Sequence, residues 1–310
     1  AHEGGVWRIV FSPDGRSFLT GGTADNHVKV WDMATDQERA TLQGHTAGVY
    51  AAAISADGSL AATGGGDQTV RVWRLPGGEA VATLTGHTNY VMAVAFTPDG
   101  RNVISASSDQ CIKVWSVADG SEIRTFGDHL SGVTSLAVAR DGKRLYSAGQ
   151  DRLILEWDLE KGTKCRSFEG HTGEIWGLAL TPDGAHLVSG GDTTVRVWDL
   201  RFGTEAAKLA HHSDQVIGVS VSPGPRYIAS VANDLQLKVW GVVPGGMARV
   251  RAKGFFGIKV QDEGGGRGVV VTEVIAGTAA DRHGLQVGDL ITKVGDIAVT
   301  GSKDSIPAIG

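Results

Sequence analysis

The sequence has little of what several functional classes require. It holds two cysteines, Cys111 and Cys165, which are too few for a disulfide framework and lack metal-ligand spacing. No run of 18 apolar residues occurs, so we expect no membrane segment in this chain. The net charge of −5 provides no basic field of the kind that attracts nucleic acid, and no nucleic-acid partner is expected.

Signals for sorting and for cofactors are also missing. The chain begins at Ala1 without a methionine or a signal-peptide pattern, so we expect further residues upstream. A cytoplasmic location is favoured, with a periplasmic or secreted one left open. No nucleophile elbow, phosphate-binding loop or metal-spaced histidine cluster occurs, so we expect no cofactor, no metal and no catalytic residue.

One spacing is present six times. An aspartate stands six residues before a tryptophan at Asp25/Trp31, Asp67/Trp73, Asp109/Trp115, Asp151/Trp157, Asp192/Trp198 and Asp234/Trp240. A histidine series accompanies these pairs at His2, His45, His87, His129, His171 and His212. The tryptophans recur every 41 or 42 residues. Such a period, with His and Trp at fixed offsets, is typical of the blades of a β-propeller.

Each unit predicts four short strands. In the second unit the segments VYAAAIS, LAATG, TVRVW and EAVATL are apolar or alternating, and the turn segments ADGS and PGG separate them. PDGR or PDGA replaces ADGS in the first, third and fifth units, where Asp and Gly suit a tight turn. The sequence therefore predicts an all-β propeller of four-stranded blades over residues 1–253.

Residues 1–253 resemble the WD-repeat family. The matching elements are GH at 44–45, 86–87 and 170–171, and WD at 31–32, 157–158 and 198–199. Six repeats are visible, and MARVRAK aligns as the outermost strand of the last one. Seven is the commonest blade number of the family, so a seventh unit upstream is a second interpretation.

The resemblance implies a structural tetrad of His, Ser or Thr, Asp and Trp in each repeat. The expected sets are His45, Thr63, Asp67 and Trp73; His87, Ser105, Asp109 and Trp115; His129, Ser147, Asp151 and Trp157; and His171, Ser189, Asp192 and Trp198. A rival interpretation is a hydrolase triad of Ser or Thr, His and Asp. Six evenly spaced copies that end in Trp favour the structural role.

The family also implies a docking face where the histidine-bearing loops emerge. Residues three or five positions after the histidines supply Trp7, Tyr50, Tyr90, Met92, Glu174, Trp176 and Ile217. Aromatic residues and Met are enriched in the cores of protein interfaces, so we expect a protein partner there. The alternative is that these side chains only pack into neighbouring blades.

After Gly254 the pattern changes, and GVVVTEVIAGTAADRHGLQVGDLITKVGDIAV resembles a PDZ domain of the type found in bacterial proteases. The resemblance implies that a peptide C-terminus adds as a strand, with its carboxylate held by backbone N–H groups at Phe255, Phe256, Gly257 and Ile258. The family's groove needs a further helix and strand, so we expect residues 254–310 to be a PDZ domain truncated at its C-terminal end.

Two functions fit these observations. The first is a non-catalytic scaffold that binds a protein partner on the propeller and a peptide C-terminus on the PDZ domain. The second is the regulatory part of a larger bacterial, protease-like enzyme whose catalytic domain lies outside this chain. A fragment of a bacterial protein is expected in either case.

Overall fold

The computed structural model describes residues 2–224 and 227–242, and the backbone of short strands at 250–251, 258–262, 269–274, 290–291, 293–294 and 297–298. The chain divides into two compact units, Ala1–Leu178 and Ala179–Gly310. The residues that the structure describes form strands and turns. Among them, no helix has the length and apolar character that crossing a bilayer requires.

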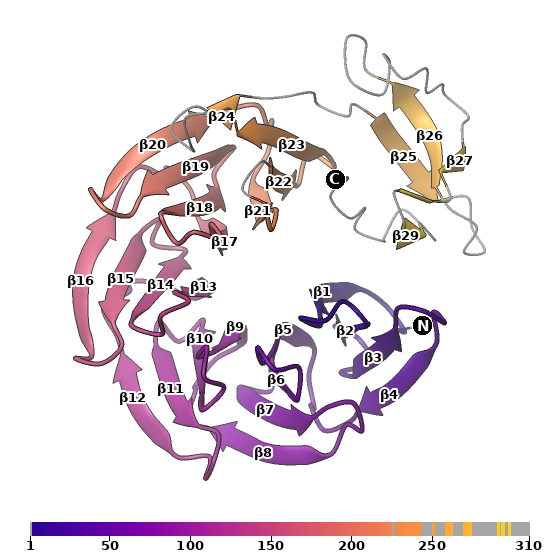
Figure 1. Ribbon diagram of the computed structural model, residues 1–310, viewed down its shortest axis with the longest axis vertical. Coiled ribbons are helices and arrows are strands. Elements are labelled where there is room, and N and C mark those ends of the chain that lie inside the picture. Colours follow the sequence, from indigo (N-terminus) through magenta and orange to yellow (C-terminus); the bar gives the residue numbers. More distant parts are fainter. Residues whose placement is uncertain are drawn as a thin grey trace. The chain divides into compact units, whose positions relative to one another are not determined.

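The strands form six four-stranded sheets, the blades of a propeller, in which consecutive strands are neighbours (Figure 1). The first blade contains β1 (Val6–Phe11), β2 (Ser17–Gly22), β3 (Val28–Asp32) and β4 (Glu38–Leu42). The second contains β5 (Val49–Ile54), β6 (Leu60–Gly65), β7 (Thr69–Arg74) and β8 (Ala80–Thr85). The third contains β9 (Val91–Phe96), β10 (Asn102–Ser107), β11 (Ile112–Ser116) and β12 (Glu122–Phe126).

The remaining blades repeat this order. The fourth contains β13 (Val133–Val138), β14 (Arg144–Gly149), β15 (Ile154–Asp158) and β16 (Thr163–Phe168). The fifth contains β17 (Ile175–Leu180), β18 (His186–Gly191), β19 (Thr194–Asp199) and β20 (Thr204–Leu209). The sixth contains β21 (Val216–Val221), β22 (Tyr227–Ala232), β23 (Leu237–Val242) and β24 (Val250–Arg251). The prediction of a propeller with six four-stranded blades is confirmed.

Further strands follow the sixth blade. A three-stranded sheet contains β25 (Ile258–Asp262), β26 (Val269–Val274) and β27 (Leu290–Ile291), and β28 (Lys293–Val294) pairs with β29 (Ile297–Ala298). Residues 275–289, between β26 and β27, lie outside the described residues.

Tight turns join the first two strands of the blades. In the second blade, the hydroxyl of Ser55 and the backbone N–H of Ser59 donate to Oδ1 of Asp57 at 2.6 and 3.0 Å. These hydrogen bonds lower the pKa of the Asp57 carboxyl to about 2. Gly58 follows with a φ of 73°, a left-handed conformation that a residue with a Cβ adopts at a cost.

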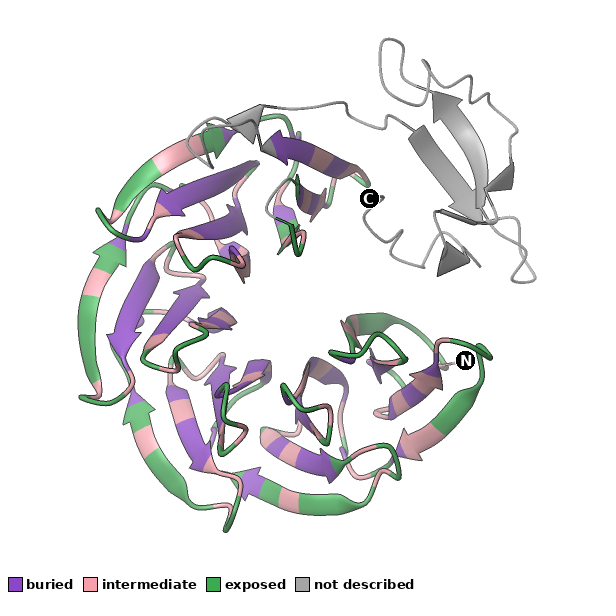
Figure 2. Cartoon of the chain, in the orientation of Figure 1, coloured by how far each residue is buried: buried purple, intermediate pink, exposed green. Residues whose placement is uncertain are grey.

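Consecutive blades pack face to face. We call the face that carries the repeat tryptophan the leading face of a blade and the opposite one its trailing face. Apolar side chains of the first blade's trailing face (Leu19, Val28, Val30 and Leu42) pack against Val49, Ala61 and Trp73 on the second blade's leading face. Equivalent clusters join the second and third, the third and fourth, and the fifth and sixth blades. The outermost strands β4, β8, β12, β16 and β20 are more exposed (Figure 2).

The leading face of the first blade differs from the other five. Val6 is 43% exposed, whereas the corresponding residues Val49, Val91, Val133, Ile175 and Val216 are each 0% exposed. Phe11 is 49% exposed, and Phe18 and Trp31 are partly buried. These three rings pack on one another, with Phe18 stacked on Trp31 at a centroid distance of 6.0 Å. The first blade therefore presents an apolar face of a kind that every other blade buries.

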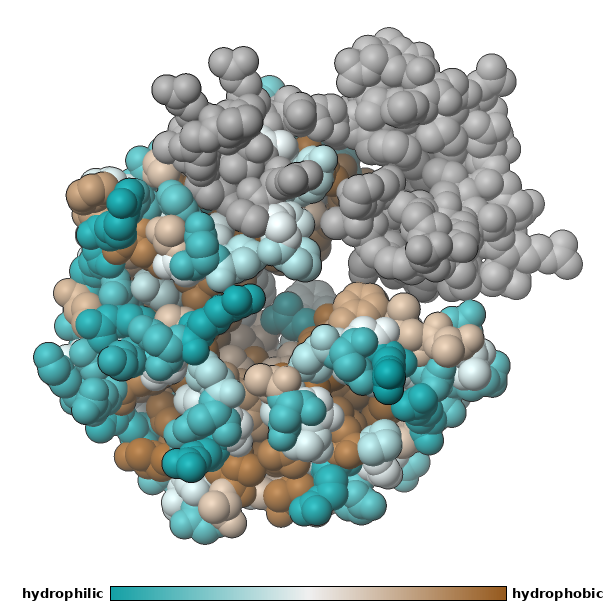
Figure 3. All heavy atoms as spheres, in the orientation of Figure 1, coloured by the Kyte–Doolittle hydropathy of each residue, from teal (hydrophilic) through white to brown (hydrophobic). Residues whose placement is uncertain are grey.

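On the side of the molecule in view, hydrophobic side chains gather over the blades built from β5–β12, with hydrophilic side chains around them (Figure 3).

Candidate functional site

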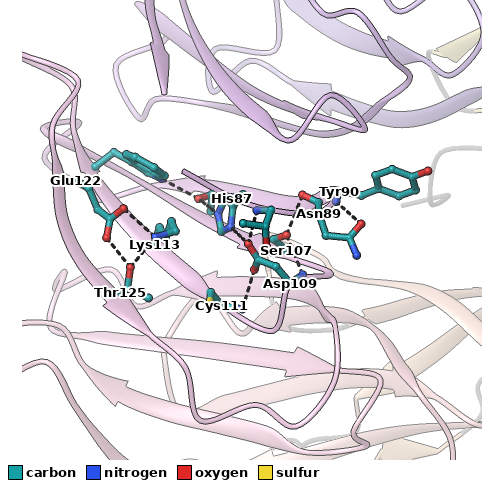
Figure 4. A network of polar contacts seen from close by, with 12 residues as sticks. His87, Asn89, Tyr90, Ser107, Asp109, Cys111, Lys113, Glu122 and Thr125 are labelled. Carbon is teal, nitrogen blue, oxygen red and sulfur yellow. Dashed lines mark hydrogen bonds and ion pairs between the residues drawn. The ribbon is translucent and has the colours of Figure 1, made fainter. Parts of the chain in front are cut away.

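A chain of hydrogen bonds joins the four predicted tetrad residues of the third blade. Nδ1 of His87 lies 2.8 Å from Oδ2 of Asp109, and Nε2 of His87 lies 2.8 Å from Oγ of Ser105. The indole N–H of Trp115 donates to the same Oγ at 2.8 Å. A carboxylate can only accept, so Nδ1 carries the imidazole proton and Nε2 accepts from the hydroxyl. Figure 4 shows this network, with the Tyr90 side chain directed away from it.

The second and fourth blades have the same geometry. His45 Nδ1 lies 2.9 Å from Oδ2 of Asp67, and both His45 Nε2 and the indole of Trp73 lie 2.8 Å from Oγ1 of Thr63. In the fourth blade, the corresponding distances from His129 to Asp151, from His129 to Ser147 and from Trp157 to Ser147 are 2.8, 2.7 and 2.8 Å.

The fifth blade is built around a shorter turn. The indole of Trp198 donates to Ser189 at 2.9 Å across nine positions, whereas this interval is ten in the second, third and fourth blades. Asp192 has a φ of 37°, while elsewhere the residue after the aspartate takes the positive φ, as Gln68 and Gln110 do. Asp192 accepts from the backbone and hydroxyl of Thr194 at 2.8 and 2.6 Å.

Two tetrad members were missing from the sequence analysis. Thr20 completes the network of the first blade, where it contacts His2 and Trp31 at 2.7 Å. Ser230 does the same in the sixth blade, with His212 at 2.8 Å and Trp240 at 2.9 Å. Both stand 18 residues after the histidine of their repeat, as Thr63 does. This interval could therefore have identified Thr20 and Ser230 from the sequence.

The tetrads of the second and third blades keep a negative charge. Burial lowers the pKa of His45 and of His87 below 6.5, although the neighbouring carboxylate opposes this shift. Burial also disfavours ionisation of Asp67 and Asp109, but hydrogen bonds, including those from backbone N–H groups, hold the pKa of each carboxyl below its ordinary value. At neutral pH each pair is therefore a neutral imidazole beside an ionised carboxylate.

The order Ser105–His87–Asp109 resembles that of a hydrolase triad, but its surroundings differ. A nucleophilic hydroxyl has to reach a substrate carbonyl. Ser105 is 0% exposed, and its oxygen already accepts a hydrogen bond from the Trp115 indole. This arrangement can hold a blade together, because each buried polar group has a partner.

Three of the predicted docking residues form a row across the first three blades. The rings of Trp7 and Tyr50 meet edge to face at 6.1 Å and 89°, and those of Tyr50 and Tyr90 stack at 5.7 Å and 29°. Trp7 is 53% exposed and Tyr90 50% exposed, and Tyr50 between them is partly buried. We call Trp7, Tyr50 and Tyr90 the aromatic row.

The other predicted docking residues are not joined to this row by any ring contact among the described residues. Met92, Glu174 and Trp176 are partly buried, and Ile217, in the second compact unit, is 45% exposed. The seven residues thus come from two positions in the repeat, and ring contacts link three of them.

The predicted carboxylate-binding segment cannot be placed. Phe255, Phe256 and Gly257 lie outside the described residues, and Ile258 begins β25, of which the backbone alone is described. Over the part of the chain that the structure does describe, no group of three or more His, Cys, Asp or Glu side chains is arranged to hold a metal ion.

Comparison with known proteins gives two family matches. The WD domain, G-beta repeat, matches residues 1–32, 36–74, 78–116, 120–158, 162–199 and 203–241, and the PDZ domain matches residues 246–304. One stretch of 65 residues is 42% identical to the small ribosomal subunit protein RACK1y of Oryza sativa subsp. japonica. That stretch covers 21% of this chain and 19% of the plant protein.

Proposed function

This chain belongs to the WD-repeat family, and on that premise we propose that it is a non-catalytic scaffold whose aromatic row docks a protein partner. WD repeats and PDZ domains are generally protein-interaction modules. The scaffold would hold one partner on the propeller and the C-terminus of another on the PDZ domain.

The exposed aromatic row is the observation that carries this proposal. Tyr and Trp are enriched among residues that dominate binding energy, because they bury a large area and lose few rotamers. The rings of Trp7, Tyr50 and Tyr90 already support one another, so little ordering is needed when a partner covers them.

Replacing Trp7 and Tyr50 together by alanine is expected to abolish capture of the partner, because the row loses two of its three rings. The measurement is quantitative mass spectrometry of proteins retained by the immobilised chain from a lysate of the cells that produce it. Phe202→Ala is a matched control, since Phe202 is 71% exposed and lies outside the row. The proposal fails if the double variant retains the same proteins as the parent chain while its circular dichroism spectrum is unchanged.

For the PDZ domain, we expect binding of a hydrophobic peptide to require a free C-terminal carboxylate. Backbone N–H groups at Phe255–Ile258 would bind that charge, so an amidated peptide should bind at least about tenfold more weakly. Fluorescence anisotropy with both peptides measures this difference, and equal affinities would contradict it. If the domain is truncated, a chain extended beyond Gly310 will bind the free-acid peptide more tightly than residues 1–310.

We also propose where the two domains divide and how many blades the propeller has. We place the domain boundary after residue 253. The pairing of β24 with β23 in the sixth blade supports a boundary beyond Arg251, whereas the PDZ match begins earlier, at residue 246. The exposed leading face of the first blade, with Val6, Phe11 and Trp31, supports a seventh blade that would cover it.

The second candidate function is a regulatory part of a larger, protease-like enzyme. It rests on the resemblance of residues 254–310 to PDZ domains of bacterial proteases. Sequencing the gene on both sides of this region tests it directly. A hydrolase domain in the same reading frame would favour this function over a scaffold.

A further inference from the structure

We propose that the aromatic row binds an extended basic segment of the partner, with arginine or lysine at alternate positions. This inference rests on the proposed docking function and specifies its chemistry.

Carboxylates outnumber cations around the row. The loops of the first three blades at this end comprise residues 2–7, 22–28, 43–50, 64–69, 86–92 and 106–111. They contain Glu3, Asp25, Asp67 and Asp109 and no lysine or arginine. Such a surface attracts a cationic partner and disfavours an acidic one.

The nearby cations offset only part of this charge. Arg71 lies against Gly44, and the partly buried Arg8 follows Trp7 in β1. Lys29 and Lys113 pair with Glu38 and Glu122 at 2.6 and 2.8 Å, so each lysine is already balanced by a carboxylate. Because His87 is neutral at pH 7, it leaves the charge of Asp109 uncompensated. Four carboxylates (Glu3, Asp25, Asp67 and Asp109) against two arginines leave the surroundings of the row with a net negative charge.

The turns that carry Asp67 and Asp109 contact the segments that carry the two tyrosines. The backbone N–H of Gly66 donates to the carbonyl of Gly48 at 2.8 Å, which brings the turn before Asp67 against the start of β5. A Cβ on Gly66 would lie 3.2 Å from Cε2 of Tyr50, so the ring rests on this glycine. In the third blade, the backbone N–H of Ser108 donates to the carbonyl of Tyr90 at 2.9 Å, one residue before Asp109. The backbone at or near each tyrosine is thus hydrogen-bonded to the turn that carries Asp67 or Asp109.

The distance between neighbouring rings of the row is close to the distance between alternate side chains of an extended peptide. Neighbouring ring centroids are 6.1 and 5.7 Å apart. Alternate side chains of a β-strand point to one side and are about 6.6 Å apart. A cation placed over the face of an aromatic ring, within about 6 Å of its centre, is attracted to the ring, and arginine does this most often. Two arginines separated by one residue therefore have about the spacing of neighbouring rings in the row.

The test measures the affinity of the purified chain for three fluorescent heptapeptides with amidated C-termini, which removes the PDZ ligand. One has arginines alternating with glycines, one has three consecutive arginines flanked by glycines, and one has norleucine in place of the alternating arginines. The alternating arginine peptide should bind about fivefold more tightly than the consecutive one and about tenfold more tightly than the norleucine one, and added salt should weaken it. Tyr50→Leu should weaken it about tenfold, whereas the control Tyr227→Leu, at an exposed tyrosine on the sixth blade, should leave it unchanged.

Each other outcome has a defined meaning. If the norleucine peptide binds as tightly and Tyr50→Leu still weakens it, the row docks an apolar partner, so the inference is wrong and the proposed function stands. If the two arginine peptides bind equally, if no arginine peptide binds, or if Tyr50→Leu has no effect, the inference is overturned. Loss of the natural partner from the double variant at Trp7 and Tyr50 would then still support docking on the row.

Discussion

Replacing Trp115 by alanine is expected to lower the free energy of unfolding by about 3–5 kcal/mol, the usual cost of removing a large buried aromatic side chain. Trp115 is 2% exposed and packs between the second and third blades, in a cluster with Val91, Val103 and Leu84. Its loss would also remove the indole donor from Ser105. Urea denaturation followed by circular dichroism measures the change.

The matched control is Trp31→Ala in the first blade. Trp31 makes the same hydrogen bond, to Thr20 at 2.7 Å, but it is only partly buried. Because burial sets most of the loss, this change should cost roughly half as much or less. Equal losses for Trp31 and Trp115 would contradict the assignment of an uncovered leading face. In a longer chain with the proposed seventh blade, the cost of Trp31→Ala should rise to that of Trp115→Ala.

Asp109→Ala is expected to destabilise the chain by about 1–3 kcal/mol, because it removes the acceptor of several donors in a partly buried turn. Nδ1 of His87 and the backbone N–H groups of Thr88 and Cys111 all bond to this carboxylate, at 2.8 to 2.9 Å. Thermal or urea unfolding of the variant gives the measured loss.

The control for this change is Asp128→Ala. The Asp128 side chain is 50% exposed and lies 3.6 Å from Lys164, so its removal should change stability by less than about 0.5 kcal/mol. A double-variant cycle with His87→Ala isolates the bond between the imidazole and the carboxylate. A loss for Asp109→Ala as small as that for Asp128→Ala would rule out a structural tetrad in this blade.

The sequence predicted the blades well because their defining contacts lie within one sheet. His87 and Ser105 are 18 positions apart, and Ser105 and Trp115 are 10 apart, so one spacing sets the whole network. The first blade nearly repeats this spacing, with His2 and Thr20 18 positions apart and Thr20 and Trp31 11 apart. The exposure of Trp31, however, depends on a neighbouring blade and could not be predicted from its own repeat.

The local backbone conformation and the contacts between blades could not be predicted from the sequence either. The single missing residue in the fifth unit was visible as a shorter interval, but the positive φ of Asp192 was not. Met92, Trp7 and Tyr50 each stand five residues after the histidine of their repeat, so the sequence pattern predicted the same role for all three. Only the structure shows that Trp7 and Tyr50 make ring contacts and belong to the row. These contacts depend on side-chain rotamers and on the packing of adjacent blades, which the sequence does not give.

The most direct test of docking on the aromatic row is site-specific photo-crosslinking. A photoreactive phenylalanine analogue replaces Tyr50 in one variant and Tyr227 in another, and each is irradiated in a lysate of the producing cells. The proposed function predicts a crosslink to the same protein partner from position 50 and none from position 227. A crosslink from position 227 alone, or from neither position while the parent chain still captures its partner, would contradict docking on the row.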